Sequence, residues 1–214
     1  MKAAQYNAWY DSARGRWIGD TEFALLCRHL DMRRGASVLD VGCGTGWFTR
    51  RLAGAGLALT GLDVDAHALD FARQHSDRSI AYLQGDARRL PFADQSFDQV
   101  VSVTALCFVD DWPRALAEIV RVTRRRFVLA LLNRHSLLWR DKGREGGQGA
   151  YQGAHWHSRA ELEEAFKRLP VENLRFGTAV FLASGTPWAR TVERLAPNSL
   201  PWGACLVVSG DALH

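Results

Sequence analysis

The sequence has no apolar run long enough to cross a membrane. Its longest one, at residues 127–132, falls far short of the roughly 20 residues that a transmembrane helix needs. Residues 1–11 are polar and aromatic, and they lack the apolar segment of a secretory signal peptide. With a length of 214 residues, 47 % of them hydrophobic, these absences predict one soluble domain in the cytoplasm with no membrane partner.

The cysteines form no pattern typical of a metal site or a redox motif. No two of them are separated by two residues, and no histidine pair stands at zinc-binding spacing beside them. We therefore expect reduced thiols and no bound metal. The four are Cys27, Cys43, Cys107 and Cys205.

A concentrated patch of positive charge is also absent. The formal net charge is +4, but the arginine doublets and one triplet are spread along the chain rather than gathered in a basic tail. A nucleic-acid-binding face stays open as an alternative. The short chain and the lack of an appended nucleic-acid domain favour a small-molecule substrate instead, and the oligomeric state stays open.

Short apolar segments alternate with helical patterns over residues 37–132, which is typical of a parallel sheet with helices on both faces. A long glycine-rich segment, residues 133–156, interrupts this alternation. We expect strands at residues 37–41, 57–62, 80–83, 97–103, 127–132, 174–183 and 204–209. We expect helices at residues 21–32, from the glycine segment to about 53, and at 66–74, 112–122 and 159–169.

The strongest motif is Val-Leu-Asp-Val-Gly-Cys-Gly-Thr-Gly at residues 38–46. Glycines at a strand-to-helix turn let the backbone approach a ligand, and the following helix N-terminus suits an anionic group such as a pyrophosphate or a carboxylate. Trp47 stands where a dinucleotide-binding pattern needs its third glycine, and the Gly-Lys-Ser/Thr of a Walker loop is missing. Asp40, two residues before Gly42, favours a ligand that also carries an ammonium.

Two further acids follow successive predicted strands. Asp63 lies 21 residues after Gly42, the spacing at which an acid accepts hydrogen bonds from ribose hydroxyls. Asp86 follows the third strand and is placed to accept a hydrogen bond from an adenine amino group. Because the carboxyl ends of parallel strands meet at one sheet edge, the three acids predict a single nucleoside-binding site there.

These motifs resemble those of the class I S-adenosylmethionine-dependent methyltransferases, in the small-molecule (type 11) group that includes the ubiquinone-biosynthesis methyltransferases. The resemblance covers residues 36–132 and rests on residues 38–46, 61–65, 85–92 and 97–106. It implies a Rossmann-like, doubly wound α/β fold whose mostly parallel seven-stranded sheet has an antiparallel last strand. It also implies S-adenosylmethionine as cofactor and S-adenosylhomocysteine as product.

The same resemblance assigns cofactor contacts. The glycine loop, which ends at Gly46, would hold the methionine part through its backbone, and Asp63 would bind the ribose. Val64 would pack on adenine, while Asp86 and the Ala87 N–H would read the edge of its ring. The remaining contacts implied are Gly42, Cys43 and Gly44 on the methionine, and Thr104 and Ala105 beside the sulfonium.

The resemblance also divides the chain into an N-terminal helical lid (1–35), a cofactor-binding core (36–132) and a substrate side (133–214). In the lid, Tyr6, Tyr10 and Arg14 are candidates for contact with the cofactor's carboxylate. An aromatic helix packed on the core explains the same residues equally well.

The methyl acceptor is not named by any motif. The segment after the fourth strand lacks the signature of nucleobase amine methylation and the Pro-Cys nucleophile of cytosine methylation, so we expect Cys107 to be a buried apolar residue. His155 and His157, with His135 and Tyr151, are candidates for a general base. We expect methyl transfer to a small molecule; an RNA or protein methyltransferase and a catalytically silent cofactor-binding protein are the alternatives.

Overall fold

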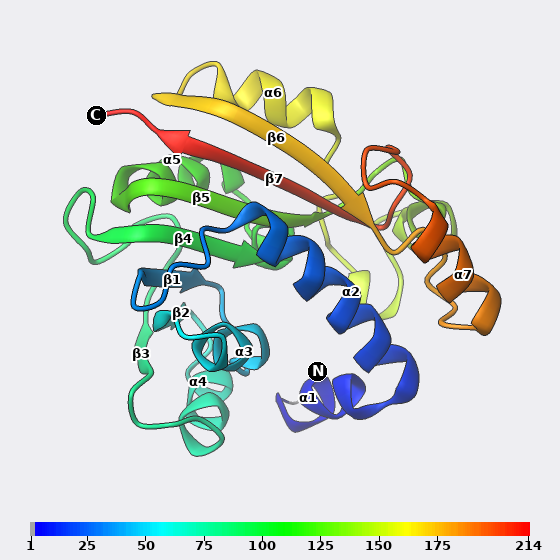
Figure 1. Ribbon diagram of the computed structural model, residues 1–214, viewed down its shortest axis with the longest axis horizontal. Helices are drawn as coiled ribbons and strands as arrows, with labels where there is room; N and C mark the ends of the chain where they lie inside the picture. The colour runs from blue at the N-terminus through cyan, green and yellow to red at the C-terminus, as the bar shows by residue number, and fades with distance from the viewer. Residues whose placement is uncertain (1–2) are drawn as a thin grey trace.

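The computed structural model describes the backbone of residues 3–214 and the side chains from Asn7 onward. The helices are α1 (Ala3–Asp11), α2 (Ala13–His29), α3 (Trp47–Gly54), α4 (Ala66–Gln74), α5 (Trp112–Val122), α6 (Arg159–Phe166) and α7 (Pro187–Leu195). The strands are β1 (Ser37–Val41), β2 (Ala58–Asp63), β3 (Ala81–Gln84), β4 (Phe97–Val103), β5 (Thr123–Leu132), β6 (Val171–Ala179) and β7 (Cys205–Ala212). Figure 1 shows these elements along the chain.

The strands form one seven-stranded sheet in the order β3-β2-β1-β4-β5-β7-β6. Strands β1 to β5 pair in parallel, and β7 inserts antiparallel between β5 and β6. This confirms the expected mostly parallel sheet with an antiparallel last strand. From β1 the chain adds β2 and β3 toward one edge of the sheet, and then adds β4 and β5 on the other side of β1. Open α/β sheets bind ligands at such a switch point, which here lies between β1 and β4.

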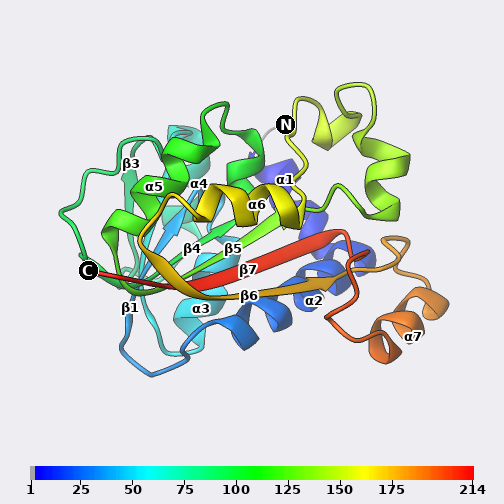
Figure 2. The same ribbon diagram turned by 90° about the horizontal axis from the view of Figure 1, so that it is seen from above.

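Side chains alternate between the two faces of the central strands and build two apolar cores. Val38 and Val101 belong to the core under α2, α3 and α4, whereas Leu39 and Val100 belong to the core under α5 and α6. Figure 2 shows α5 and α6 on one side of the sheet and α2 and α3 on the other. Burying both faces explains why the strands are almost continuously apolar.

Three elements differ most from expectation, and β6 is also shifted, to Val171–Ala179 from the expected 174–183. Helix α2 begins at Ala13 rather than near residue 21, because the Ser12 side chain caps it by accepting from the Gly15 N–H. Strand β5 begins at Thr123, so the arginine triplet lies within a strand and not in a loop. Helix α7 was not predicted, although Thr186 caps it and Pro187 occupies its first turn.

The arginine triplet is partly neutralised by acids on neighbouring strands. Arg124 lies 3.1 Å from Asp98 on β4, and Arg126 lies 2.8 Å from Asp211 on β7. Arg124 and Arg126 therefore have acidic partners within the sheet, and their presence does not require a bound polyanion such as a nucleic acid. Within residues 3–214, every helix is too short or too polar to traverse a lipid bilayer.

Candidate functional site

The glycine loop forms the strand-to-helix turn that its sequence predicts. Gly42, Gly44 and Gly46 have φ values of +75°, +51° and +74°. A Cβ on Gly42 would lie 2.1 Å from the Cβ of Ala105, so only glycine lets this loop approach the segment after β4. A Cβ on Gly44 would meet nothing within 4 Å, which places its backbone against open space.

That open space is part of a cavity of about 420 Å³ at the carboxyl edge of the sheet. The volume is typical of small-ligand sites. The Thr45 hydroxyl, in the wall of this cavity, is buried and has no hydrogen-bond partner among the side chains described from Asn7 onward or the described backbone. The predicted cofactor residues in the wall are Tyr10, Asp40, Gly42, Cys43, Gly44, Asp63, Val64, Asp86, Ala87, Thr104 and Ala105.

Asp63 ends β2 and is held in place by the backbone around it. Its Oδ2 accepts from the Gly44 N–H at 2.7 Å, and its Oδ1 accepts from the Asp65 N–H at 2.9 Å. The carboxylate therefore ties the glycine loop to the start of α4. The following side chain, Val64, is 68 % exposed at the cavity, a conformation that leaves it free to cover a flat ring.

Asp40 is the buried acid of the site. Its Oδ2 accepts from the Thr49 hydroxyl on α3 at 2.6 Å. Burial raises the pKa of Asp40 to about 7; the Thr49 hydrogen bond lowers that pKa and the negative charge of Asp63 raises it. A cationic group entering the cavity would stabilise the ionised form of this carboxyl.

Asp86 carries an ion pair that the sequence analysis did not foresee. Arg88 contacts both carboxylate oxygens through its guanidinium, at 2.7–3.1 Å, and donates its backbone N–H as well. These hydrogen bonds from Arg88 lower the pKa of Asp86 to about 2. Arg88 also lines the cavity. In the sequence, only its position two residues after Asp86 could have indicated this ion pair.

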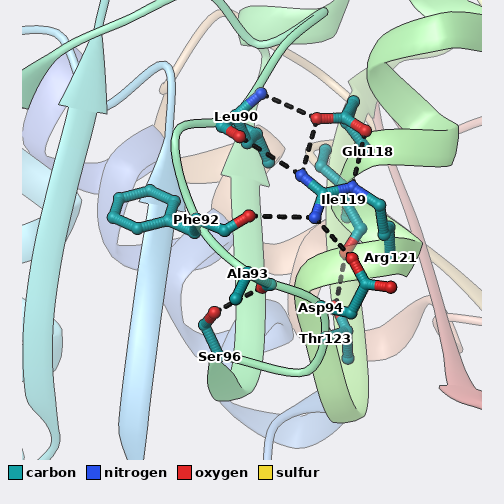
Figure 3. A network of polar contacts seen from close by, with 9 residues as sticks. All are labelled: Leu90, Phe92, Ala93, Asp94, Ser96, Glu118, Ile119, Arg121 and Thr123. Carbon is teal, nitrogen blue, oxygen red and sulfur yellow. Dashed lines mark hydrogen bonds and ion pairs between the residues drawn. The ribbon is translucent and has the colours of Figure 1, made fainter.

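A polar cluster fixes the chain just after this adenine-side segment, as Figure 3 shows. Arg121 on α5 donates to the carbonyls of Leu90 and Phe92 and pairs with Asp94 at 2.7 Å. It also pairs with Glu118, whose carboxylate accepts from the Leu90 N–H at 2.8 Å. The guanidinium thus joins residues 90–94 to α5.

Arg121→Ala is expected to lower the free energy of unfolding by about 2–3 kcal/mol, because several charge-assisted hydrogen bonds are lost and Glu118 loses the ion pair with Arg121. Urea denaturation measures this loss. The matched control is Arg124→Ala, which removes one exposed ion pair worth about 0–1 kcal/mol. Equal losses in the two variants would contradict the role given to Arg121.

The other wall of the cavity is aromatic. Tyr10 stacks on Trp47 with ring centroids 4.2 Å apart, and Phe48 packs edge-on against Tyr10. Phe108, half exposed, lines the same cavity after β4. Trp47, Phe48 and Phe108 were missed by the sequence analysis, because only the folded chain brings α1, α3 and this turn together.

Two of the predicted cofactor residues lie outside the cavity wall. The Arg14 Nε donates to the Ala183 carbonyl at 2.6 Å, and Arg14 is not in the cavity wall. Gly46 is not in the wall either; a Cβ there would lie 2.5 Å from the Tyr82 hydroxyl, so this glycine serves packing. The side chain of Tyr6 lies outside the described residues.

The candidate bases are also absent from the cavity wall. His157 is fully buried, and burial, together with the charge of His155, lowers its pKa to about 3. His155 stands beside the site, since its N–H donates to the Cys107 carbonyl at 2.7 Å, and its ring bonds to Glu161. The expectation for Cys107 is confirmed: it is buried, and burial raises its thiol pKa to about 12.

The glycine-rich segment 133–156 has more structure than its composition suggests. It contains a π-helical turn at Trp139–Gly143 and a 3₁₀ turn at Gly149–Tyr151, and the N–H of Gly153 donates to the Gly146 carbonyl. A Cβ on Gly143 would lie within 3 Å of the rings of Trp139 and Trp156. At least this glycine therefore serves aromatic packing.

Comparisons with known proteins fit this geometry. Residues 39–131 match the methyltransferase domain family. A malonyl-[acyl-carrier protein] O-methyltransferase of Pectobacterium atrosepticum is 44 % identical over 117 residues, which are 54 % of this chain and 44 % of that protein. A 2-phytyl-1,4-naphthoquinone methyltransferase of Thermosynechococcus vestitus is 44 % identical over 98 residues, 44 % of each chain.

A solved structure shares the whole fold. An S-adenosylmethionine-dependent methyltransferase of Thermotoga maritima, described as a possible histamine N-methyltransferase, superposes with a TM-score of 0.80 at 24 % identity, over 98 % of this chain and 96 % of that one. Residues 39–131 therefore belong to the methyltransferase domain family, and the chain has the fold of the class I S-adenosylmethionine-dependent methyltransferases. The matched part of the chain spans less than half the length of the two curated relatives named above.

Proposed function

We propose that this methyltransferase transfers the methyl group of S-adenosylmethionine to a nucleophilic atom of a small molecule. One observation carries the proposal: the acids at the ends of β1, β2 and β3 and the glycine loop line a single cavity. The names of the two curated relatives support a small acceptor group: one acts on malonyl-[acyl-carrier protein], whose malonyl group is carried by a protein, and the other on a phytyl naphthoquinone.

We propose that the cofactor occupies this cavity from the glycine loop to Asp86. In our proposal the unpartnered Thr45 hydroxyl and the N–H groups of the glycine loop bind the methionine carboxylate. Asp40 faces its ammonium, and Asp63 accepts from the ribose hydroxyls. Val64 covers the adenine, whose amino group bonds to Asp86.

Bound S-adenosylmethionine supplies an electrophilic methyl group on a sulfonium. The protein's part is to hold the acceptor in line with that group and to exclude water, and such positioning supplies much of the rate of a displacement. Ala105, held against Gly42, and the aromatic wall of Tyr10, Trp47 and Phe108 would shape the acceptor's approach. A role of His155 or His157 as general base stays a prediction; the low pKa of His157 and its burial do not favour it.

Two alternatives are separated from this proposal by one experiment. The methyltransferase is incubated with S-adenosylmethionine labelled in the methyl group and a cell extract divided into small molecules, RNA and protein. We expect label in the small-molecule fraction, and much less label with Asp63→Ala at the same cofactor concentration. Label in RNA or protein would favour those acceptors, and tight cofactor binding without any transfer would favour a silent cofactor-binding protein.

A further inference from the structure

A cluster of two histidines and one glutamate lies outside the cofactor cavity. His155 and His157 belong to an extended segment beside the end of β5, where the His157 N–H donates to the Leu132 carbonyl at 2.8 Å. Side chains two residues apart in an extended chain point to the same side. The two imidazole rings accordingly lie 4.5 Å apart, while Trp156 between them is buried among apolar side chains.

The third member, Glu161, is aimed at the histidines by the start of α6. Ser158 caps this helix, accepting from the Glu161 N–H, and the Glu161 carboxylate accepts from the Ser158 N–H in return. This capping box leaves Glu161 Oε1 at 2.7 Å from His155 Nε2 and Oε2 at 3.9 Å from His157 Nδ1. One donor atom from each of the three residues lies within 4.8 Å of the other two.

His157 is the unexplained part of this cluster. Its side chain is fully buried, yet neither of its ring nitrogens has a hydrogen-bond partner among the residues that the structure describes. A buried polar group without a partner is destabilising, so a ligand for this ring would stabilise the folded chain.

We propose that His155, His157 and Glu161 bind one divalent transition-metal ion of the zinc type. Two imidazole nitrogens and one carboxylate suit zinc, cobalt or nickel better than magnesium or calcium, which prefer oxygen ligands. Zinc bonds of about 2.0–2.2 Å require small rotations of the side chains, in which the ion replaces the His155–Glu161 hydrogen bond. Water completes the coordination, because His155 and Glu161 are 42 % and 30 % exposed.

The ion would fasten α6 to the wall of the cofactor cavity. The His155 N–H already bonds to the Cys107 carbonyl, and the next residue, Phe108, lines the cavity. The ion would therefore stabilise the acceptor side of the cavity wall without touching the cofactor. Its spacing, His-x-His followed by Glu four residues later, was visible in the sequence but is not one of the zinc patterns sought there.

The test uses the full chain without an affinity tag, freed of metal by a chelator that is then removed. Titration with Co²⁺ is followed by visible d–d absorption and by calorimetry, and Zn²⁺ is added to displace it. We expect one ion per chain, an intense tetrahedral spectrum lost on Zn²⁺ addition, and a raised melting temperature with Zn²⁺. No methyl acceptor is needed, so the result is independent of the proposed function.

The variants are His155→Gln and Glu161→Gln, and the second keeps the capping box because glutamine also serves there. We expect each to weaken Co²⁺ binding at least 100-fold while S-adenosylhomocysteine affinity, which reports the fold, stays unchanged. His135→Ala, an exposed histidine of the same segment, is the control and should bind as wild type does. Fewer than one ion per wild-type chain, or equal affinity in wild type and Glu161→Gln, would overturn the proposal.

Discussion

Asp63→Ala is expected to weaken the binding of S-adenosylhomocysteine about 100-fold. Under the proposed function this carboxylate accepts two hydrogen bonds from the ribose, and a hydrogen bond to a charged group contributes about 1.5–3 kcal/mol. The same carboxylate also holds the Gly44 and Asp65 N–H groups, so its loss loosens the glycine loop as well. Calorimetric titration measures the effect.

Asp65→Ala is the matched control for this prediction. Asp65 lies two residues further along and caps α4 by accepting from the N–H groups of His67 and Ala68. Its loss should cost about 1 kcal/mol of stability and leave the affinity unchanged, because Asp65 is not in the cavity wall. NADH should not bind to wild type. A loss below tenfold in Asp63→Ala, or tight NADH binding, would contradict the assignment of Asp63.

Much of the fold was predictable because its elements carry local signals. The helix Trp112–Val122 has the predicted bounds, since Asp111 caps it and its apolar residues recur on one face. The start of β5 was not predictable, because Arg124 and Arg126 interrupt the apolar pattern. Their acidic partners, Asp98 and Asp211, come from distant parts of the sequence.

The cofactor side of the site was predictable for a similar reason. Asp40 lies one residue before the end of β1, Asp63 ends β2 and Asp86 lies two residues after β3, so their meeting at one sheet edge needs only the parallel topology. The acceptor side depends on contacts between distant segments, such as Tyr10 on Trp47. The burial of His157 is likewise a tertiary property, and no local pattern distinguishes it from an exposed loop histidine.

Asp40→Asn is expected to stabilise the protein at pH 8 and to weaken cofactor binding at the same time. The folded state keeps a proton on Asp40 up to about pH 7, whereas the unfolded chain loses it near pH 4. Between these values the unfolded state binds fewer protons, so wild-type stability falls as the pH rises. Asparagine does not ionise and still accepts from Thr49, so the variant should gain about 2–4 kcal/mol at pH 8 and little at pH 4.

Urea denaturation at pH 4 and pH 8 tests whether Asp40→Asn gains stability as the pH rises, with Asp98→Asn as the control. The pKa of Asp98 is lowered, first by its hydrogen bond from the Ser37 N–H, so this variant should lose stability at pH 8. Under the proposed function, the ammonium of S-adenosylhomocysteine favours ionised Asp40. Wild-type affinity should therefore fall as the pH drops below about 7, and Asp40→Asn should bind weakly at every pH. A variant less stable than wild type at pH 8 would mean that Asp40 is held ionised by a partner other than the cofactor.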